Sequence, residues 1–151
     1  MTDDLAPRRS GERLRTRLVC AAVLAACGSL LFVATRIEPN ARGFGTHRQL
    51  GLPMCGFLLV SGVPCATCGM TTAFTHAVRG DLMAALATQP AGALFAVSVA
   101  ALVLVSAYGL VFGLSLAPLW YNFWRLRPVL GGVAVVLVAW IYKIIVVTGT
   151  L

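Results

Sequence analysis

The sequence predicts an all-α integral membrane protein with three transmembrane helices and one short amphipathic or re-entrant helix. Of its 151 residues, 59% are hydrophobic and 11% are charged, whereas soluble domains typically carry ~25% charged residues. The apolar residues gather in three long runs, and arginine and aromatic residues cluster beside these runs. Long apolar runs flanked in this way are typical of membrane-spanning helices.

The first predicted span covers residues 18–35, in which no charged residue occurs. At ~1.5 Å per residue this run reaches about 27 Å, which is enough to cross the hydrocarbon core. Residues 1–17 contain five arginines and no apolar periodicity, so we predict a disordered basic tail. The residues up to Cys27 also resemble a lipoprotein cleavage site, but the apolar run continues beyond it, which favours an uncleaved helix.

Two further spans are predicted at residues 91–117 and 129–147, so that residues 18–151 form a single membrane domain. Near the end of the last span, Lys143 is expected to snorkel to the membrane surface beside Trp140 and Tyr142. The loop between these two spans carries residues typical of a headgroup boundary, namely Trp120, Tyr121, Trp124, Arg125 and Arg127.

The arginines predict the orientation of the spans. With three spans, the N-terminal tail and the loop around Arg125 lie on one side, and the positive-inside rule makes that side cytoplasmic. Residues 36–90, which include the cysteine motif segment of residues 50–90, then face outward. Four arginines on that outer side oppose this assignment, namely Arg36, Arg42, Arg48 and Arg79.

Short elements are predicted between the first two spans. Residues 54–63 are apolar but too few to cross the bilayer as a helix, and Pro64 ends them. From Met70 onward the apolar residues recur with helical spacing, which predicts an amphipathic helix that stops at Gly80. Asp81 is expected to cap the segment that follows. The apolar stripe of this helix consists of Met70, Ala73, Phe74, Ala77 and Val78.

A Cys-x-x-Cys motif, Cys65-Ala66-Thr67-Cys68, precedes the amphipathic helix. Cys65 and Cys68 are close enough in sequence to form a disulfide or to share a metal, and Cys55 is a candidate third sulfur. Cys68 is expected at the first turn of the helix, where the helix dipole favours a reactive thiolate. Cys20 and Cys27 lie within the first span and are predicted to be small core residues.

Three hypotheses for this motif stay open. The first is a redox or structural disulfide. The second is a zinc site whose ligands are Cys55, Cys65, Cys68 and His47. His76 is a poor ligand candidate, because it follows Cys68 by eight residues, roughly 12 Å along a helix axis. The third hypothesis is a tight re-entrant turn built from small residues.

A polar stripe runs along one face of the predicted amphipathic helix, opposite Phe74. It comprises Cys68, Thr72, Thr75 and Arg79. A thiol, two hydroxyls and a guanidinium suit an anion, but a solvated helix face shows the same pattern, and we favour the solvated face.

Several residues of this segment match a known pattern at its spacing: Cys55, Gly62, Cys65, Cys68, Gly69, Thr71, Ala73, Gly80, Asp81 and Pro90. In this respect the chain resembles a family of small bacterial membrane proteins, domain of unknown function 2752, over roughly residues 50–100. The chain departs from the family pattern at Ala66, Thr72 and Gln89, where proline, arginine and asparagine are usual. The resemblance implies a bacterial membrane location and a cysteine-centred motif, and it implies no reaction.

We therefore predict a multi-pass protein of the bacterial inner membrane with a cytoplasmic N-terminus and an outward-facing Cys-x-x-Cys segment that serves thiol-redox chemistry or metal binding. The alternative is a non-enzymatic assembly or scaffold subunit with a structural cysteine turn. In that case the second span would contact a partner or a second copy through Gly109 and Gly113. The sequence contains no nucleotide-binding loop, hydrolase constellation or carboxylate pair, and no nucleic-acid partner is expected.

Overall fold

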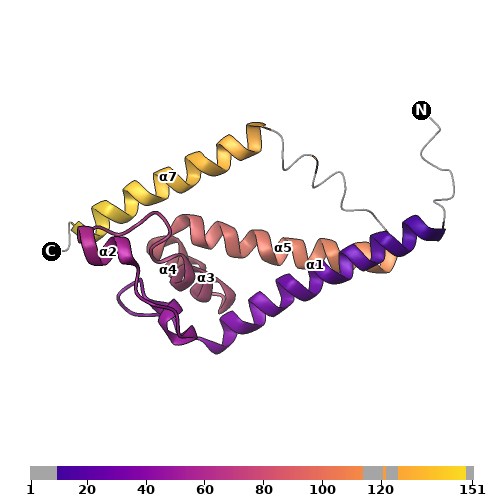
Figure 1. The fold of residues 1–151 in the computed structure, drawn as a ribbon, viewed down its shortest axis with the longest axis horizontal. Helices are drawn as coiled ribbons and strands as arrows, with labels where there is room; N and C mark the ends of the chain where they lie inside the picture. The colour runs from indigo at the N-terminus through magenta and orange to yellow at the C-terminus, as the bar shows by residue number, and fades with distance from the viewer. Residues whose placement is uncertain (1–9, 114–120, 122–125, 149–151) are drawn as a thin grey trace.

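The computed structural model describes residues 10–113, 121 and 126–148. Within this part of the chain the regular elements are helices, and three of them are long and apolar enough to cross a membrane. These are α1 (Ser10–Arg36), α5 (Pro90–Phe112) and α7 (Leu126–Thr148) (Figure 1). The predicted all-α fold with three membrane-spanning helices is confirmed.

The ends of the spans differ most from the prediction at the start of α1 and at the end of α5. α1 begins at Ser10, so residues 10–17 extend the helix instead of belonging to a disordered tail. Arginine has a high helix propensity, and Glu12 in the first turn suits the helix dipole. α5 ends at Phe112 because Gly113 adopts a left-handed conformation (φ 72°) and its N–H bonds the Gly109 carbonyl at 2.8 Å. Residues 1–9 and 114–120 lie outside the described part.

α1 and α5 run antiparallel and side by side, with α3 (Met70–Val78) and α4 (Leu82–Thr88) packed beside the start of α5 (Figure 1). A buried cluster joins Ala34 of α1, Phe74 of α3 and Ala96 and Val99 of α5. The predicted small core residues are in place, since Cys20 is buried and Cys27 packs against this cluster. Through this core the amphipathic helix α3 packs against the two spans α1 and α5.

The amphipathic helix and its predicted stripe are confirmed in α3. Ala73 and Phe74 are buried, and Ala77 and Val78 pack against the core. The preceding apolar segment forms only a short exposed helix, α2 (Gly56–Ser61), and a 3₁₀ helix, η2 (Thr46–Leu50), precedes it. These short elements lie between the ends of α1 and α5, where they form the frame of the cysteine segment.

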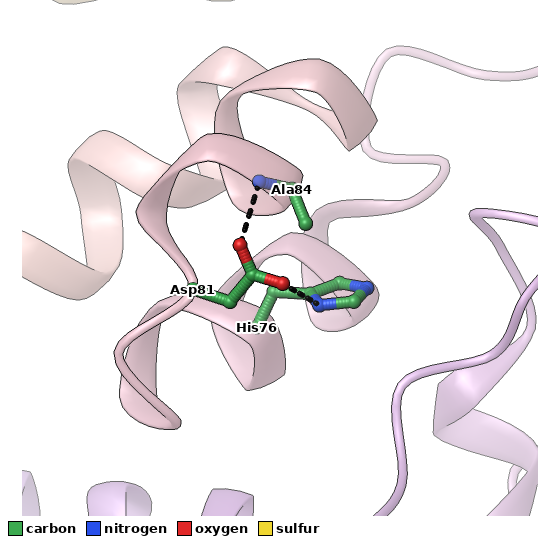
Figure 2. A network of polar contacts seen from close by, with 3 residues as sticks. All are labelled: His76, Asp81 and Ala84. Carbon is green, nitrogen blue, oxygen red and sulfur yellow. Dashed lines mark hydrogen bonds and ion pairs between the residues drawn. The ribbon is translucent and has the colours of Figure 1, made fainter.

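The turn between α3 and α4 follows the predicted stop and cap. Gly80 has a φ of 86°, and the Asp81 carboxylate accepts a hydrogen bond of 3.0 Å from the backbone N–H of Ala84. The second carboxylate oxygen lies 3.7 Å from Nδ1 of His76 (Figure 2). His76 therefore belongs to this cap, and the exclusion of His76 from the cysteine site agrees with its position.

α7 stands apart from the α1–α5 pair along much of its length and approaches the cysteine segment with its C-terminal end (Figure 1). Three polar side chains make this attachment. Trp140 donates to the Pro64 carbonyl (2.9 Å), Tyr142 to the Ala87 carbonyl (2.9 Å), and Lys143 to the carbonyls of Gly43 (3.1 Å) and Thr88 (3.0 Å). The expected snorkelling of Lys143 is wrong, because its side chain is 3% exposed and its ammonium is used inside the protein.

Candidate functional site

The sulfur atoms of Cys55 and Cys65 lie close together in the cysteine segment. Cys55 is the N-cap of α2, and Cys65 directly follows Pro64 after the helix has ended. The left-handed Gly62 (φ 69°) turns the chain back between them. The Cys55 thiol thereby donates a hydrogen bond of 3.4 Å to Sγ of Cys65. The sequence motif instead pointed to Cys65 and Cys68 as the pair.

Cys65 is the half-buried thiol on which the hydrogen bonds converge. Burial on its own would raise its pKa, but hydrogen bonds from Thr67 and Cys55 favour the thiolate and bring the pKa below its ordinary value. The Thr67 hydroxyl lies 3.3 Å from the sulfur. Cys65 is therefore the thiol of this segment whose surroundings favour ionisation.

Cys68 has the opposite character. It lies before Gly69, the N-cap of α3, and not within the first helical turn, and it is 8% exposed. Burial, together with the nearby sulfurs of Cys65 and Cys55, raises its pKa to about 11, although the Lys143 ammonium opposes the shift. The prediction of a reactive Cys68 thiolate is wrong, because burial favours the neutral thiol at this position.

A tight backbone contact holds Cys68 beside Lys143. Gly69 adopts φ 88°, and a Cβ atom at this position would lie 2.6 Å from the Gly43 carbonyl oxygen and 3.1 Å from Nζ of Lys143. Lys143 bonds that same Gly43 carbonyl. The glycine of the motif thus lets the chain pass directly over the lysine.

The turn between the two motif cysteines is fixed by Gln89, the residue before α5. Gln89 is fully buried, and its Nε2 donates to the Ala66 carbonyl at 3.1 Å. Its Oε1 has no hydrogen-bond partner among the described residues. The amide therefore attaches the motif to α5.

Most of the predicted polar stripe is buried, and only Arg79 is exposed. Thr72 and Thr75 are both fully buried, so the solvent-facing interpretation is wrong for these residues. Thr72 shares a 2.8 Å hydrogen bond with the Thr46 hydroxyl, and Thr75 donates to the Thr71 carbonyl. Arg79 donates to the carbonyl of Ile37 at 3.0 Å. The stripe faces the loop after α1, which the sequence pattern alone does not reveal.

His47, the fourth candidate zinc ligand, bonds the Pro53 carbonyl through Nε2 at 3.1 Å. Among the described residues, no three His, Cys, Asp or Glu side chains are arranged to hold a metal ion. The candidate partner glycines lie elsewhere, since Gly109 is buried within the chain and Gly113 terminates α5. Zinc binding and a partner at these glycines both stay predictions.

A cavity of about 540 Å³ lies beside the cysteine segment. Its lining includes all three cysteines of the segment, apolar side chains of α1 and α5, and the α3 residue Phe74. Phe74 and Phe95 form a tilted ring pair with centroids 5.7 Å apart. The three thiols therefore line a cavity whose other walls come from two membrane-spanning helices.

The cavity, the thiol pair and the α3–α4 cap fall largely within one stretch of sequence. Residues 55–103 match the family model described as protein of unknown function (DUF2752). Over this stretch the chain is similar to the DUF2752 family. It begins at Cys55 and extends into the middle of α5. No curated protein and no solved structure matches the chain.

Two functional contacts were missed from the sequence. Lys143 lies outside the DUF2752 stretch and looked like a headgroup anchor, and Gln89 lies inside it but was noted only as a departure from the family pattern. The available indications were a single lysine in an otherwise uncharged span and an amide directly before the helix-starting Pro90. Neither identifies the carbonyl that the side chain binds.

Proposed function

We propose that the protein is a thiol–disulfide exchange component of the bacterial inner membrane, with Cys55 and Cys65 as its redox pair on the outer face. The proposal is supported chiefly by the 3.4 Å contact between their sulfur atoms. Two thiols at this distance need only a small movement to reach the bond length of ~2.05 Å in a disulfide. Both side chains are partly exposed, so a second protein can reach them.

The exchange starts from the disulfide form of the pair. A thiolate of a partner protein attacks Sγ of Cys55, a mixed disulfide forms, and Cys65 leaves as a thiolate. Cys65 is the better leaving group because its pKa is lowered. The partner's second thiolate then attacks the partner sulfur of the mixed disulfide and releases Cys55. The partner dithiol is oxidised to a disulfide, and the Cys55–Cys65 pair is reduced.

Cys68 has a supporting position in this scheme. Its raised pKa of about 11 leaves it almost entirely as a neutral thiol near pH 7. As a neutral thiol, Cys68 is a poor nucleophile, so it does not compete with Cys55 to form a disulfide with Cys65. The Cys-x-x-Cys motif is then not itself the exchanging pair, in contrast to the interpretation that its spacing suggests.

The test is to equilibrate the full-length protein, in nanodiscs, with mixtures of reduced and oxidised glutathione, and to identify the bridged cysteines by alkylation and peptide mass spectrometry. We expect Cys55 and Cys65 to lose their thiols together. The Cys55→Ser and Cys65→Ser variants should lose the bridge, and Cys27→Ser, the matched control in α1, should keep it.

A bridge between Cys65 and Cys68, or no bridge at any glutathione ratio, would overturn the proposal. The second result, together with unchanged stability of Cys55→Ser, would favour the scaffold alternative. Zinc analysis of the same sample checks the metal hypothesis directly, since stoichiometric zinc held by these cysteines would also exclude a free redox pair.

A further inference from the structure

The cavity beside the redox pair has a composition that selects its ligand. Among its lining residues are Leu30 and Val33 of α1 and Phe95 of α5, all in membrane-spanning helices. These three side chains remain 42%, 40% and 47% exposed, so the cavity is not sealed on this side. A molecule dissolved in the hydrocarbon of the membrane can therefore reach the sulfur atoms.

The charges of the lining exclude several redox partners. None of the lining residues is Asp, Glu, Lys or Arg. Glutathione, flavin nucleotides and nicotinamide dinucleotides all carry charges that a binding site normally pairs or hydrogen-bonds. The polar lining groups are thiols, threonine hydroxyls such as those of Thr67 and Thr71, and the His47 ring. Hydrogen-bonding groups of this kind suit carbonyl oxygens on a ring.

The volume fits a small molecule. At about 540 Å³ the cavity lies in the range of pockets for compact organic ligands, ~300–1,000 Å³. The tilted rings of Phe74 and Phe95 offer aromatic surface, on which a flat ring stacks favourably. An apolar, neutral, ring-shaped molecule that accepts two electrons and two protons has the chemistry of a quinone.

We propose that this cavity binds a lipid-soluble quinone, which reoxidises the Cys55–Cys65 dithiol. The inference rests on the redox function proposed above and names its electron acceptor. The Cys65 thiolate adds to a ring carbon of the quinone. The Cys55 sulfur then attacks Sγ of Cys65, the disulfide bond forms and the carbon–sulfur bond breaks. The bonding electron pair goes to the ring, the two thiol protons go to the two ring oxygens, and a quinol leaves.

The experiment uses the full chain in phosphatidylcholine nanodiscs, with a benzoquinone that carries a decyl tail as the probe. Binding is measured on the Cys55→Ser/Cys65→Ser protein, which cannot transfer electrons. Electron transfer is measured on the reduced natural chain as quinol formed per disulfide. We expect saturable binding in the first case and one quinol per disulfide in the second.

Substitutions in the lining locate the site. Val33→Trp should fill the cavity and weaken quinone binding at least tenfold. Leu18→Trp, on the same helix, 62% exposed and outside the lining, should leave binding unchanged. Leu52→Trp, in the loop part of the lining, gives a second cavity-filling variant if Val33→Trp does not fold. Equal binding by all these variants would overturn the proposal, as would equal competition by a decyl chain without the quinone ring.

The outcomes separate this inference from the proposed function. If the thiol pair equilibrates with glutathione but the quinone neither binds nor is reduced, the inference fails and the exchange function stands. If the quinone binds but no bridge forms with any oxidant, the redox function fails together with the role of the quinone as electron acceptor.

Discussion

The ammonium of Lys143 donates a hydrogen bond of 3.1 Å to the carbonyl oxygen of Gly43, one hundred residues earlier in the chain. The same ammonium bonds the carbonyl of Thr88 at 3.0 Å. One side chain of the last span therefore ties the loop after α1 to the end of α4. Because Cys68 and Gly69 pass over this lysine, the cysteine segment is held by a helix that lies outside the DUF2752 stretch.

Gly69→Ala should destabilise the protein strongly. The new methyl group would meet the Gly43 carbonyl oxygen at 2.6 Å, in a backbone conformation (φ 88°) that side chains rarely adopt. Left-handed strain alone costs ~1–3 kcal/mol, and the clash adds to it. The measurement is the thermal unfolding midpoint in detergent.

Gly62→Ala is the matched control for this substitution. Gly62 has a φ of 69°, but a Cβ atom there would meet nothing within 4 Å. We expect a clearly smaller loss of stability than for Gly69→Ala. Equal losses of stability would mean that backbone strain explains both effects and that the contact with the Gly43 carbonyl does not contribute.

Trp140→Phe should loosen the attachment of α7. The change removes the indole N–H that bonds the Pro64 carbonyl at 2.9 Å and keeps an aromatic ring in place. Loss of such a hydrogen bond costs ~0.5–1.5 kcal/mol, and slightly more when the carbonyl stays buried. Pro64 is fully buried, so the unfolding midpoint should fall.

Tyr142→Phe serves as the comparison, because its hydroxyl bonds the Ala87 carbonyl in an exposed setting. Water can replace that partner, so the expected loss is within about 0.5 kcal/mol. A larger loss of stability for Tyr142→Phe than for Trp140→Phe would contradict the prediction that the Trp140 hydrogen bond contributes more to stability than the Tyr142 hydrogen bond.

The stability of the protein should depend on Cys68 at alkaline pH. The folded state raises the pKa of this thiol from 9.0 to about 11, so it favours the neutral form. The stabilising effect is fully present below pH 9 and is lost as the pH rises from 9 to 11. The unfolding midpoint of the natural chain should thus fall more steeply across this window than that of Cys68→Ala.

Alkylation gives an independent check of the same shift. With iodoacetamide near pH 7, Cys65 should react readily and Cys68 should react only after unfolding, because the thiolate is the nucleophile. Faster modification of Cys68 than of Cys65 in the folded protein would be incompatible with the burial of Cys68.

The orientation can be tested with two exposed acidic positions, Glu12 near the start of α1 and Glu38 just after its end. Single cysteines placed there, in a chain whose natural cysteines are replaced by serine or alanine, are labelled in intact cells by a membrane-impermeant maleimide. If the arginines determine topology, Glu38→Cys is labelled from outside and Glu12→Cys only after lysis. The reverse pattern would invert the assignment.

The membrane fold was predictable because it depends on composition and periodicity. Three long apolar runs, the helical spacing from Met70 to Val78 and the cap at Asp81 are all local properties, and each appears in the structure. Helix ends were less predictable. Residues 10–17 continue α1, and Gly113 stops α5. Both outcomes were hard to predict because they depend on a few weak local preferences.

The composition of the candidate site was predictable only in part. The sequence identified Cys55, Cys65 and Cys68 as a group, but spacing alone favoured Cys65 and Cys68 as the pair. The turn at Gly62 also brings Cys65 back to Cys55. Likewise, Thr72 and Thr75 have the spacing of a solvated stripe, but the tertiary packing buries both.

By itself, the sequence determined that this protein is helical, that three of its helices can cross a membrane, and which short segment carries the thiols. These properties follow from the hydrophobic effect and from local backbone preferences, which act within a few turns of chain. The tertiary structure decided which sulfurs meet, which thiol is buried and which carbonyls Lys143 binds. Those outcomes depend on contacts between residues up to one hundred positions apart, and neither spacing nor composition specifies such contacts.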